Sequence, residues 1–525
     1  MTYTSFEFFI LYFGITYLLY WVLPKKAKWT VLLAGSVLFY LFASGGHIIF
    51  LILSALIVWA VGVGIQKFND DYSEKESSLG RREKKALKSK YDRYKKAIFA
   101  AGILLNLLFI FVLKYYNFFS KTLNVHFSIN IPTLSVIVPV GISFYTLQAI
   151  SYICDVYSGK YKAEKNPLHL MLYLSFMLTS VKGPIARYDQ LGTQLVEGRK
   201  ITSKNFIFGA QLVIWGLFKK IVIADRSAEF VNNAFDQNKF DSGMLLVVAV
   251  LLYMLQFYCD FSGIMDVVRG LGQMMGFDMP TNFKQPFFAK SICEFWQRWH
   301  ITLGEWIKDY VFYPLAKSKP LKAIAKNTKN KLGAYYSALI PISIALLAAW
   351  LVNGFWHGPA WNYVAFGLYF FVLMMIGMLL EPLTTKICKG LKINRNGVVC
   401  GFFQKIRTFI IVAFSMLIFR ANSITQLKSI LITIIEKPDL EFLKKGASNG
   451  MGLTPEDYII LIGGFILVLL VSILLEKEVD IREKFSKLPF IFEFVVFLGL
   501  LFTVIIFGAY GEGYLTIDLP VHVFR

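Results

Sequence analysis

The amino-acid sequence predicts an all-α polytopic membrane protein. Of its 525 residues 56% are hydrophobic, and the mean hydropathy is +0.55. Long apolar runs recur from one end of the chain to the other, and the core of a soluble protein of this length does not need so many.

Each long apolar run predicts one membrane-spanning helix, because about 20 apolar residues in a helix cross the hydrocarbon core. The predicted spans are residues 6–23, 29–43, 48–65, 98–119, 135–153, 168–181, 206–223, 244–261, 338–352, 361–380, 402–419, 458–475 and 490–507. The first run lacks a small-residue cleavage site and continues into Pro24 and two lysines, so we expect a span rather than a signal peptide.

Positive charge is distributed unevenly along the chain, whose net charge is +21. Lys25, Lys26 and Lys28 follow the first span, and residues 67–96, after the third, contain eleven Lys and Arg residues. By the positive-inside rule these connections are cytoplasmic, which places the N-terminus outside. Residues 317–331, with six lysines and no acidic residue, are predicted to be cytoplasmic as well.

The basic clusters have two interpretations. They act as a topology signal with attraction to anionic lipid, or they dock an acidic cytosolic partner. Binding to nucleic acid is not expected, because no nucleic-acid-binding motif accompanies the charge.

The five cysteines predict neither a disulfide framework nor a metal site, because they show no C-x-x-C or other ligand spacing. An acyl-carrying thiol at Cys259 or Cys293 is an alternative that the residues leave open. We expect no metal and no tightly bound cofactor.

We expect a single polytopic domain over residues 1–525, because the sequence has neither an internal repeat nor a long flexible linker. Residues 67–96 are rich in Glu, Lys and Arg and predict a charged helical hairpin on the cytosolic side. Residues 261–314 are punctuated by glycine and proline, too polar for a simple span and too apolar for an aqueous loop. Such backbone must be covered by protein or line a cavity, so a re-entrant or interfacial segment is predicted.

One helix is predicted inside that segment, from Ser291 to Pro314. Ser291 and Glu294 form a capping-box pattern at its start. Its apolar face consists of Trp296, Trp299, Leu303, Trp306 and Tyr310, and its polar face of Arg298, Thr302, Glu305 and Asp309. At about 100° per residue, His300 lies on the border of the two faces, where it can face a cavity. The alternative is an interfacial amphipathic helix with an incidental histidine.

A second aromatic stretch, residues 353–362, interrupts two apolar runs. Gly354, Gly358 and the proline that follows predict a helix break near His357. A surface turn lined by interfacial tryptophans is the alternative interpretation.

The side chains around this break have possible tasks. We expect Trp356 and Trp361 to pack around His357. Asn353 and Asn362 are candidates for satisfying freed backbone groups or for fixing the tautomer of the imidazole. A histidine in an apolar setting is costly without a partner or a task, so acid–base chemistry inside the membrane is the first hypothesis.

These stretches resemble the membrane-bound O-acyltransferase superfamily, and within it the bacterial alginate O-acetyltransferase-like branch. The resemblance covers nearly the whole chain, and the D-alanyl transferase of teichoic acid modification is a close relative. The resemblance to the superfamily rests on these segments: SFEF at 5–8, PVGISFYTLQAISY at 139–152, DVY at 155–157, KGPIARY at 182–188, DFSG at 260–263 and NF at 282–283. The most specific matches are EFWQRWHITL at 294–303, DY at 309–310, WHG at 356–358, WN at 361–362 and FGAYGEGY at 507–514.

The resemblance implies a ring of tilted transmembrane helices with re-entrant elements around a central tunnel. It implies an O-acyltransferase that moves an acyl group, with acetyl expected, from a cytosolic thioester to a hydroxyl outside. The acceptor would be a cell-envelope polysaccharide or an extracytoplasmic partner acyltransferase. The co-substrate would be acetyl-CoA or an acyl-carrier thioester, and the location the cytoplasmic membrane of a bacterium.

The two histidines that matter in this family match His300 and His357, which the resemblance therefore implies are catalytic. We expect His357 to be the general base near the tunnel centre, and His300 to orient donor or acceptor or to share the proton transfer. Burial should lower the pKa of both imidazoles. Asn353, or the backbone amides at a break at Gly354, are candidates for stabilising the oxyanion.

Other residues of the matching motifs are expected to support the site or to line the tunnel. They are Trp296, Arg298, Trp299, Asp309, Tyr310, Trp356, Trp361, Asn362, Pro184, Arg187 and Asp260. Among them we expect Arg298, Asp309 and Asp260 to be structural partners in buried pairs.

Two other functions are compatible with the sequence. D-alanyl transfer to teichoic acid from a carrier protein is the alternative within the family, although the members of that branch are typically shorter. A glycan transporter or flippase is the alternative of another class. Transporters usually contain paired broken helices in two related halves, and this sequence shows no such halves.

Overall fold

The computed structural model describes residues 3–236, 242–439 and 452–510. Within these residues every regular element is a helix, and β pairing is limited to one isolated bridge between Phe283 and Trp299. The prediction of an all-α protein is confirmed.

Nine helical stretches in the described part of the chain are long and apolar enough to cross a membrane. They are Lys25–Glu76, Arg81–Phe127, Ser203–Phe235, Gly243–Met274, Lys319–His357, Trp361–Gly390, Val398–Arg420, Pro455–Glu476 and Phe490–Phe507. The chain is therefore a multi-pass membrane protein.

Two of the predicted spans are wrong, those at 135–153 and 168–181. The first overlaps α6 (Ile142–Ser158), of 17 residues, and the second overlaps α7 (Pro167–Ser175), of 9 residues. Nearly all side chains of α6 are buried, so these residues are apolar because they fill the protein interior. At 6–23 the structure has a shorter apolar helix, Phe8–Val22.

The described residues form two compact units, and their boundaries fall inside α9 (Ser203–Leu217) and α11 (Gly243–Met274). The units are residues 3–210 with 268–280, and residues 211–236, 242–267, 281–439 and 452–510. Besides α6 and α7, the first unit contains η1 (Phe8–Gly14), α1 (Ile15–Val22), η2 (Lys25–Ala27), α2 (Lys28–Ser44), η3 (Gly45–His47), α3 (Ile48–Glu76), α4 (Arg81–Ile110), η4 (Phe111–Tyr115), α5 (Tyr116–Phe127), η5 (Tyr188–Gly192) and α8 (Thr193–Glu197).

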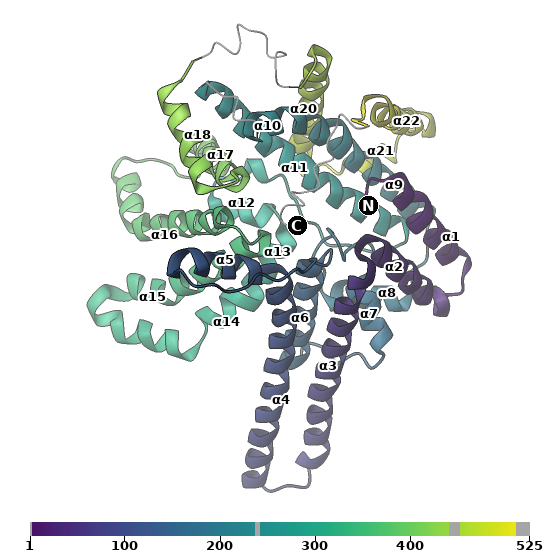
Figure 1. Cartoon of the computed structure of the whole chain (residues 1–525), viewed down its shortest axis with the longest axis vertical. Coiled ribbons are helices and arrows are strands. Elements are labelled where there is room, and N and C mark those ends of the chain that lie inside the picture. The colour runs from purple at the N-terminus through teal and green to yellow at the C-terminus, as the bar shows by residue number, and fades with distance from the viewer. Residues whose placement is uncertain (1–2, 237–241, 440–451, 511–525) are drawn as a thin grey trace. The chain divides into compact units, whose positions relative to one another are not determined.

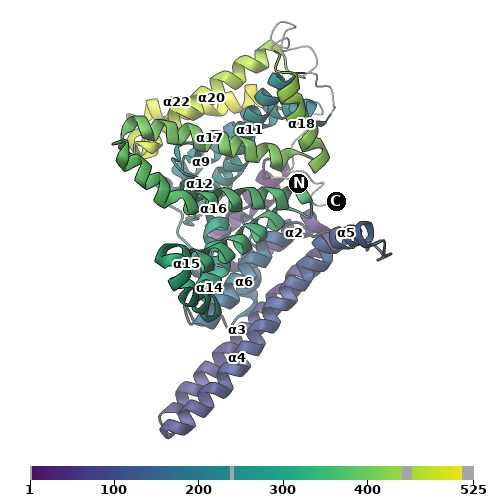
Figure 2. The same cartoon turned by 90° about the vertical axis from the view of Figure 1, so that its left-hand side faces the viewer.

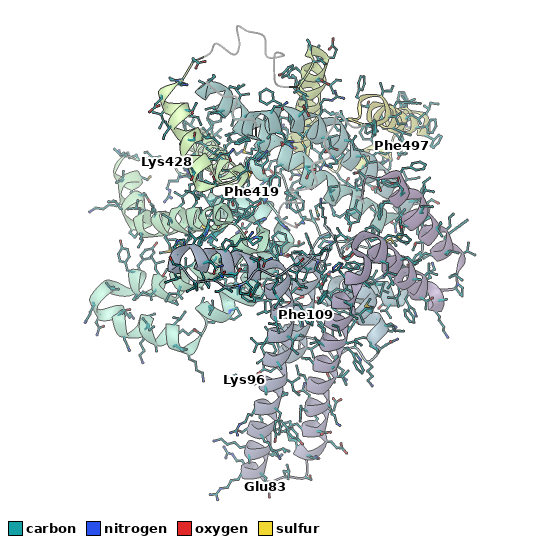
Figure 3. The ribbon with its side chains drawn as sticks, in the orientation of Figure 1. Glu83, Lys96, Phe109, Phe419, Lys428 and Phe497 are labelled. Atoms are coloured by element: carbon teal, nitrogen blue, oxygen red, sulfur yellow. The ribbon has the colours of Figure 1, made fainter. Side chains whose placement is uncertain are left out.

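The hairpin predicted at 67–96 is present, because α3 and α4 lie side by side (Figures 1 and 2). Glu83 Oε2 accepts a hydrogen bond from Gly80 N–H at 2.9 Å and so caps the start of α4. Glu83 and Lys96, labelled in Figure 3, are both exposed. The cytosolic location of the hairpin stays a prediction.

The second unit contains the rest of the helices. They are η6 (Phe218–Ala224), α10 (Asp225–Asp236), η7 (Pro286–Phe288), α12 (Ile292–Arg298), α13 (Ile301–Ile307), η8 (Lys308–Phe312), α14 (Tyr313–Ala316), α15 (Lys319–His357), α16 (Trp361–Gly390), α17 (Val398–Arg420), α18 (Ile424–Glu436), α20 (Pro455–Glu476), α21 (Ile481–Phe485) and α22 (Phe490–Phe507). The matching motif at 507–514 extends beyond Tyr510, outside the described residues.

The segment 261–314 is less irregular than its glycines suggest, because α11 continues without interruption to Met274. Gly263 does not break this helix. A Cβ at Gly263 would lie 2.8 Å from the carbonyl oxygen of Gly216 on α9, so the glycine allows two helix backbones to approach closely. The departure from long helices begins after Met274 and includes the short helices up to α14.

Charged side chains inside the second unit are held in pairs. Lys220 Nζ lies 2.5 Å from Asp225 Oδ1 and 2.6 Å from Asp260 Oδ1, and all three residues are buried. Arg226 pairs with Asp457 in the same way. An isolated buried charge costs several kcal/mol, so each of these groups depends on its partner to stay in the interior.

A second close approach joins α15 to α16. Gly354 lies within α15, and a Cβ there would be 2.5 Å from the carbonyl oxygen of Tyr363 on α16. The absence of a side chain therefore sets the spacing of the two helices beside His357.

The substitution Gly354→Ala is expected to destabilise the protein by about 1–3 kcal/mol, because the added methyl group overpacks this contact. Gly377→Ala is the matched control: it lies on α16 with nothing within 4 Å of the added Cβ. There alanine favours the helix by about 1 kcal/mol. Thermal unfolding of the detergent-purified protein, followed by tryptophan fluorescence, measures both changes. Equal midpoints for the two variants would contradict the close packing.

Candidate active site

The helix predicted from Ser291 breaks at His300. α12 ends at Arg298 and α13 begins at Ile301, with the backbone of His300 at φ 46° and ψ 51°. This left-handed conformation costs a non-glycine residue about 1–2 kcal/mol. The helical phasing that placed His300 on a polar–apolar border is therefore wrong, because the helix does not continue through it.

The start of this helix follows half of the predicted capping box. Ser291 Oγ accepts a hydrogen bond from Glu294 N–H at 3.1 Å, as a cap should. The carboxylate of Glu294 accepts from Lys290 N–H at 2.8 Å, one residue before the expected donor.

Hydrogen bonds from a preceding segment satisfy the backbone groups that the break exposes. Lys284 N–H donates to Arg298 O at 2.9 Å, and Ile301 N–H donates to Asn282 O at 3.0 Å. Thr302 N–H donates to the side-chain Oδ1 of Asn282 at 3.0 Å. Sequence reasoning did not place Asn282 in the site, although it begins one of the matching motifs.

His300 is enclosed by aromatic rings and is 2% exposed. Its ring centroid lies 4.7 Å from that of Phe261 and 5.3 Å from that of Trp356. Among the described residues, none forms a hydrogen bond with His300 Nε2. His300 lies outside the candidate spans, and burial, followed by the charge of His357, lowers its pKa well below 6.5. The lowered pKa keeps the imidazole of His300 neutral at pH 7, as the sequence predicted for this residue.

His357 is the last residue of α15, and the chain leaves the helix at Gly358. The break predicted at Gly354 is wrong, because that residue lies inside the helix. An amide there is bonded to the carbonyl four residues earlier, so it is not a free donor for an oxyanion.

Aromatic rings from three helices surround His357. Its ring centroid lies 5.0 Å from those of Trp356 and Phe419. Phe419, labelled in Figure 3, belongs to α17. Tyr363 and Phe366 of α16 follow at 6.2 and 5.9 Å.

Trp356 contacts both histidines, at 5.3 Å from His300 and 5.0 Å from His357. The residues come from the α12–α13 break and from the end of α15, more than fifty positions apart in the sequence. The structure therefore brings the two predicted histidines into one aromatic cluster.

The two asparagines near His357 have different surroundings. Asn353 lies four residues before His357 on α15, hence on the same helix face, and is buried. Its Oδ1 has no hydrogen-bond partner among the described residues. Asn362 Nδ2 donates to Phe419 O at 3.1 Å and so satisfies a carbonyl in the last turn of α17.

The predicted tryptophans also differ in position. Trp299 is buried, with its ring 5.0 Å from Phe283. The ring of Trp296 packs 5.1 Å from that of Trp350. Trp361 is 51% exposed at the start of α16, so it does not enclose His357 as Trp356 does.

Arg298 and Asp260, two charged residues of the motifs, form ion pairs between elements. Arg298 pairs with Glu294 at 2.8 Å and with Glu476 of α20 at 2.6 Å. Asp260 pairs with Lys220, as described above. Asp309 is exposed in η8, so the prediction of a buried pair is wrong for this residue. The ring of its neighbour Tyr310 packs against Trp306 at 5.3 Å.

Pro184 and Arg187 belong to the first compact unit, whereas all the other predicted site residues belong to the second. Pro184 O accepts a hydrogen bond from Ala186 N–H at 2.8 Å. Arg187 is buried, and its N–H donates to Gln190 Oε1 at 3.2 Å at the start of η5.

The described residues contain no group of three or more His, Cys, Asp or Glu side chains that could hold a metal ion. Cys259 is buried within α11. Cys293 is exposed, and desolvation by the surrounding protein together with the neighbouring Glu294 raises the pKa of its thiol, which disfavours the nucleophilic thiolate. The alternative of an acyl-carrying cysteine receives no support from this geometry.

A model of the membrane-bound O-acyltransferase family matches residues 165–329, which include the α12–α13 break and His300. The chain belongs to this family, and it is an acyltransferase. The class therefore agrees with a site that presents imidazoles in an apolar interior.

The chain is similar in sequence to proteins with three different names. The chain is 31% identical to a probable alginate O-acetylase AlgI of Pseudomonas putida over 432 residues, which cover 81% of the chain and 78% of the relative. It is 30% identical to a peptidoglycan O-acetyltransferase of Helicobacter pylori over 301 residues, 52% of the chain and 54% of the relative. It is 29% identical to a teichoic acid D-alanyltransferase of Bacillus subtilis over 330 residues, 61% of the chain and 77% of the relative.

Lowering the pH below about 6.5 is expected to destabilise the protein through His300. The unfolded histidine takes up a proton near pH 6.5, whereas the folded one, with its lowered pKa, stays neutral. Because the unfolded state then binds more protons, stability is lost as the pH falls, by up to about 1.4 kcal/mol per pH unit.

The variant His300→Gln should flatten this loss, measured as the unfolding midpoint between pH 7 and pH 5. His126→Gln is the control, since His126 is exposed on α5 and should leave the slope unchanged. A slope in His300→Gln equal to that of the wild type would contradict a buried, neutral imidazole.

Proposed function

We propose that the chain transfers an acyl group from a cytosolic thioester to a hydroxyl on the outer side of the membrane. The acyl group that we expect is acetyl. The acceptor is a cell-envelope polysaccharide or an extracytoplasmic partner acyltransferase. The relatives named for O-acetylation of alginate and peptidoglycan support this acceptor class. The observation that carries the proposal is the contact of Trp356 with both His300 and His357.

The reaction needs a base and a group that stabilises negative charge. The acceptor hydroxyl attacks the thioester carbonyl carbon, and its proton passes to His357 as general base. The tetrahedral intermediate then expels the thiolate, which takes up the proton, so that an ester and a free thiol result. The aromatic rings packed around His357 reduce the access of water, which would protect the thioester from hydrolysis.

His300 and Asn353 complete the proposed site. His300 orients donor or acceptor, or shares the proton transfer. The amide of Asn353 lies on the same face of α15 as His357 and can donate a hydrogen bond to the oxyanion. Its buried oxygen, which has no hydrogen-bond partner among the described residues, is consistent with a side chain that serves a substrate.

The proposed donor is acetyl-CoA or an acyl-carrier thioester, both of which are anionic. Exposed lysines at 317, 319 and 322 follow η8 closely in the sequence and suit either donor electrostatically. In this proposal residues 1–525 act as one acyltransferase domain of a bacterial cytoplasmic membrane, with the N-terminus outside and a tunnel from donor to acceptor.

D-alanyl transfer to teichoic acid is the second candidate, because the Bacillus subtilis relative of that name aligns over 61% of the chain. The two candidates differ in the ester that they leave on the polymer. Mass spectrometry of envelope polysaccharides from cells with and without the protein distinguishes an acetyl ester from a D-alanyl ester.

The variant His357→Ala is expected to reduce the ester content of the envelope polymer by about 10²- to 10⁴-fold, the usual contribution of a general base. Its abundance in the membrane should stay unchanged, because the side chain is only partly buried. His126→Ala, a change at an exposed histidine, is the control and should keep full acylation. Acylation that survives in His357→Ala would overturn the catalytic assignment.

A further inference from the structure

Asn282 holds the turn at His300 with its side chain as well as its backbone. It is 1% exposed. Its Oδ1 accepts hydrogen bonds from Thr302 N–H and from Thr302 Oγ1, both at 3.0 Å. The same oxygen lies 3.3 Å from His300 Nδ1, and Asn282 Nδ2 lies 3.1 Å from Met265 Sδ.

These contacts determine which atom of the Asn282 amide faces His300. A backbone N–H can only donate, so the amide atom bonded to Thr302 N–H must be the oxygen. The other amide atom faces a thioether sulfur, which can only accept, and is therefore the nitrogen. The orientation of the side chain follows from its partners.

The orientation of the amide in turn determines the tautomer of His300. An oxygen at 3.3 Å from Nδ1 requires a proton on Nδ1, because an amide oxygen cannot donate one. In a neutral imidazole the other nitrogen, Nε2, then carries the lone pair. This nitrogen is buried and has no hydrogen-bond partner among the described residues.

We propose that Asn282 is a positioning residue that holds His300 with Nδ1 protonated, so that Nε2 receives the hydroxyl of the acyl acceptor. The inference rests on the proposed function and narrows the roles left open for His300. A thioester carbonyl oxygen accepts hydrogen bonds, as a bare Nε2 does, so the two cannot bind each other. A hydroxyl donates one to Nε2, so that His300 shares in the proton transfer for which His357 is the general base.

The side chain of Asn282 is uncharged, and this affects how readily His300 binds a proton at Nε2. When Nε2 takes up this proton during the shared transfer, the resulting imidazolium keeps its Nδ1–H bond to the amide oxygen. A carboxylate in place of the amide would stabilise the imidazolium and raise the pKa of His300 by about 1–3 units. The imidazole would then be protonated over a wider range of pH, and over that range it could not accept the proton.

Nitrogen NMR of the full-length protein in detergent, with histidine labelled at both ring nitrogens, reads the tautomer directly. The chain has six histidines, and His300→Gln identifies the signal. At pH 7 we expect a protonated Nδ1 and an unprotonated Nε2. A protonated Nε2 in the wild-type protein would overturn the proposal.

Two variants connect the tautomer to activity, assayed as transfer of labelled acetyl from acetyl-CoA to envelope material in isolated membranes between pH 5.5 and 8.5. Asn282→Leu should lose the single tautomer and lower kcat about 10- to 100-fold. Asn282→Asp keeps the oxygen that accepts from Nδ1, so its activity should recover at high pH. The midpoint of the acid limb of its pH profile should lie about one pH unit or more above that of the wild type.

Thr302→Val is the matched control, because it removes one hydrogen bond to Asn282 Oδ1 but leaves the contact with His300. It should leave the midpoint of the pH profile unchanged, whatever its effect on stability. A purely structural role of Asn282 predicts the same midpoint for Asn282→Asp as for the wild type, and that result would also overturn the proposal. Because the NMR signal does not depend on acylation, a failure of the proposed function leaves the tautomer test intact.

Discussion

The left-handed turn at His300 interrupts a helix in an apolar interior, and the protein supplies the hydrogen bonds that the helix loses there. Asn282 provides a carbonyl oxygen and a side-chain oxygen, and Lys284 provides an amide. Water cannot take these places in a buried site without a cavity to hold it. The direction of the imidazole, its contact with Trp356 and the start of α13 all depend on this short antiparallel pairing.

Buried ion pairs hold the helices against which the turn rests. Lys220 connects η6 to Asp225 on α10 and to Asp260 on α11, and the residue after Asp260 is Phe261, whose ring meets His300. Breaking one partner of such a set leaves an uncompensated charge and costs about 3–5 kcal/mol. The pairs therefore fix the register of α11, and with it one wall of the aromatic cluster.

An apolar cluster with two imidazoles suits acyl transfer by simple electrostatics. Burial keeps His300 neutral, so it can accept a proton at the pH of the cytosol. In the proposed reaction, an amide partner (Asn282) rather than a carboxylate leaves the basicity of His300 low enough for a shared proton to return to the departing thiolate. Membership in the membrane-bound O-acyltransferase family gives the reaction class, and the residues around Trp356 give it a physical basis.

The sequence by itself determined the all-α membrane class, most of the spans and the cap at Ser291. It also singled out the two histidines, whose catalytic role stays a prediction. These follow from local composition, from helix-end chemistry and from the cost of a polar group among apolar ones. It did not reveal the break at His300, the continuity of α11 through Gly263 or that of α15 through Gly354. The tertiary structure decided each of these, because the deciding contacts come from elsewhere in the chain. Asn282 lies 18 residues from His300, and the helix backbones that Gly263 and Gly354 admit belong to other helices.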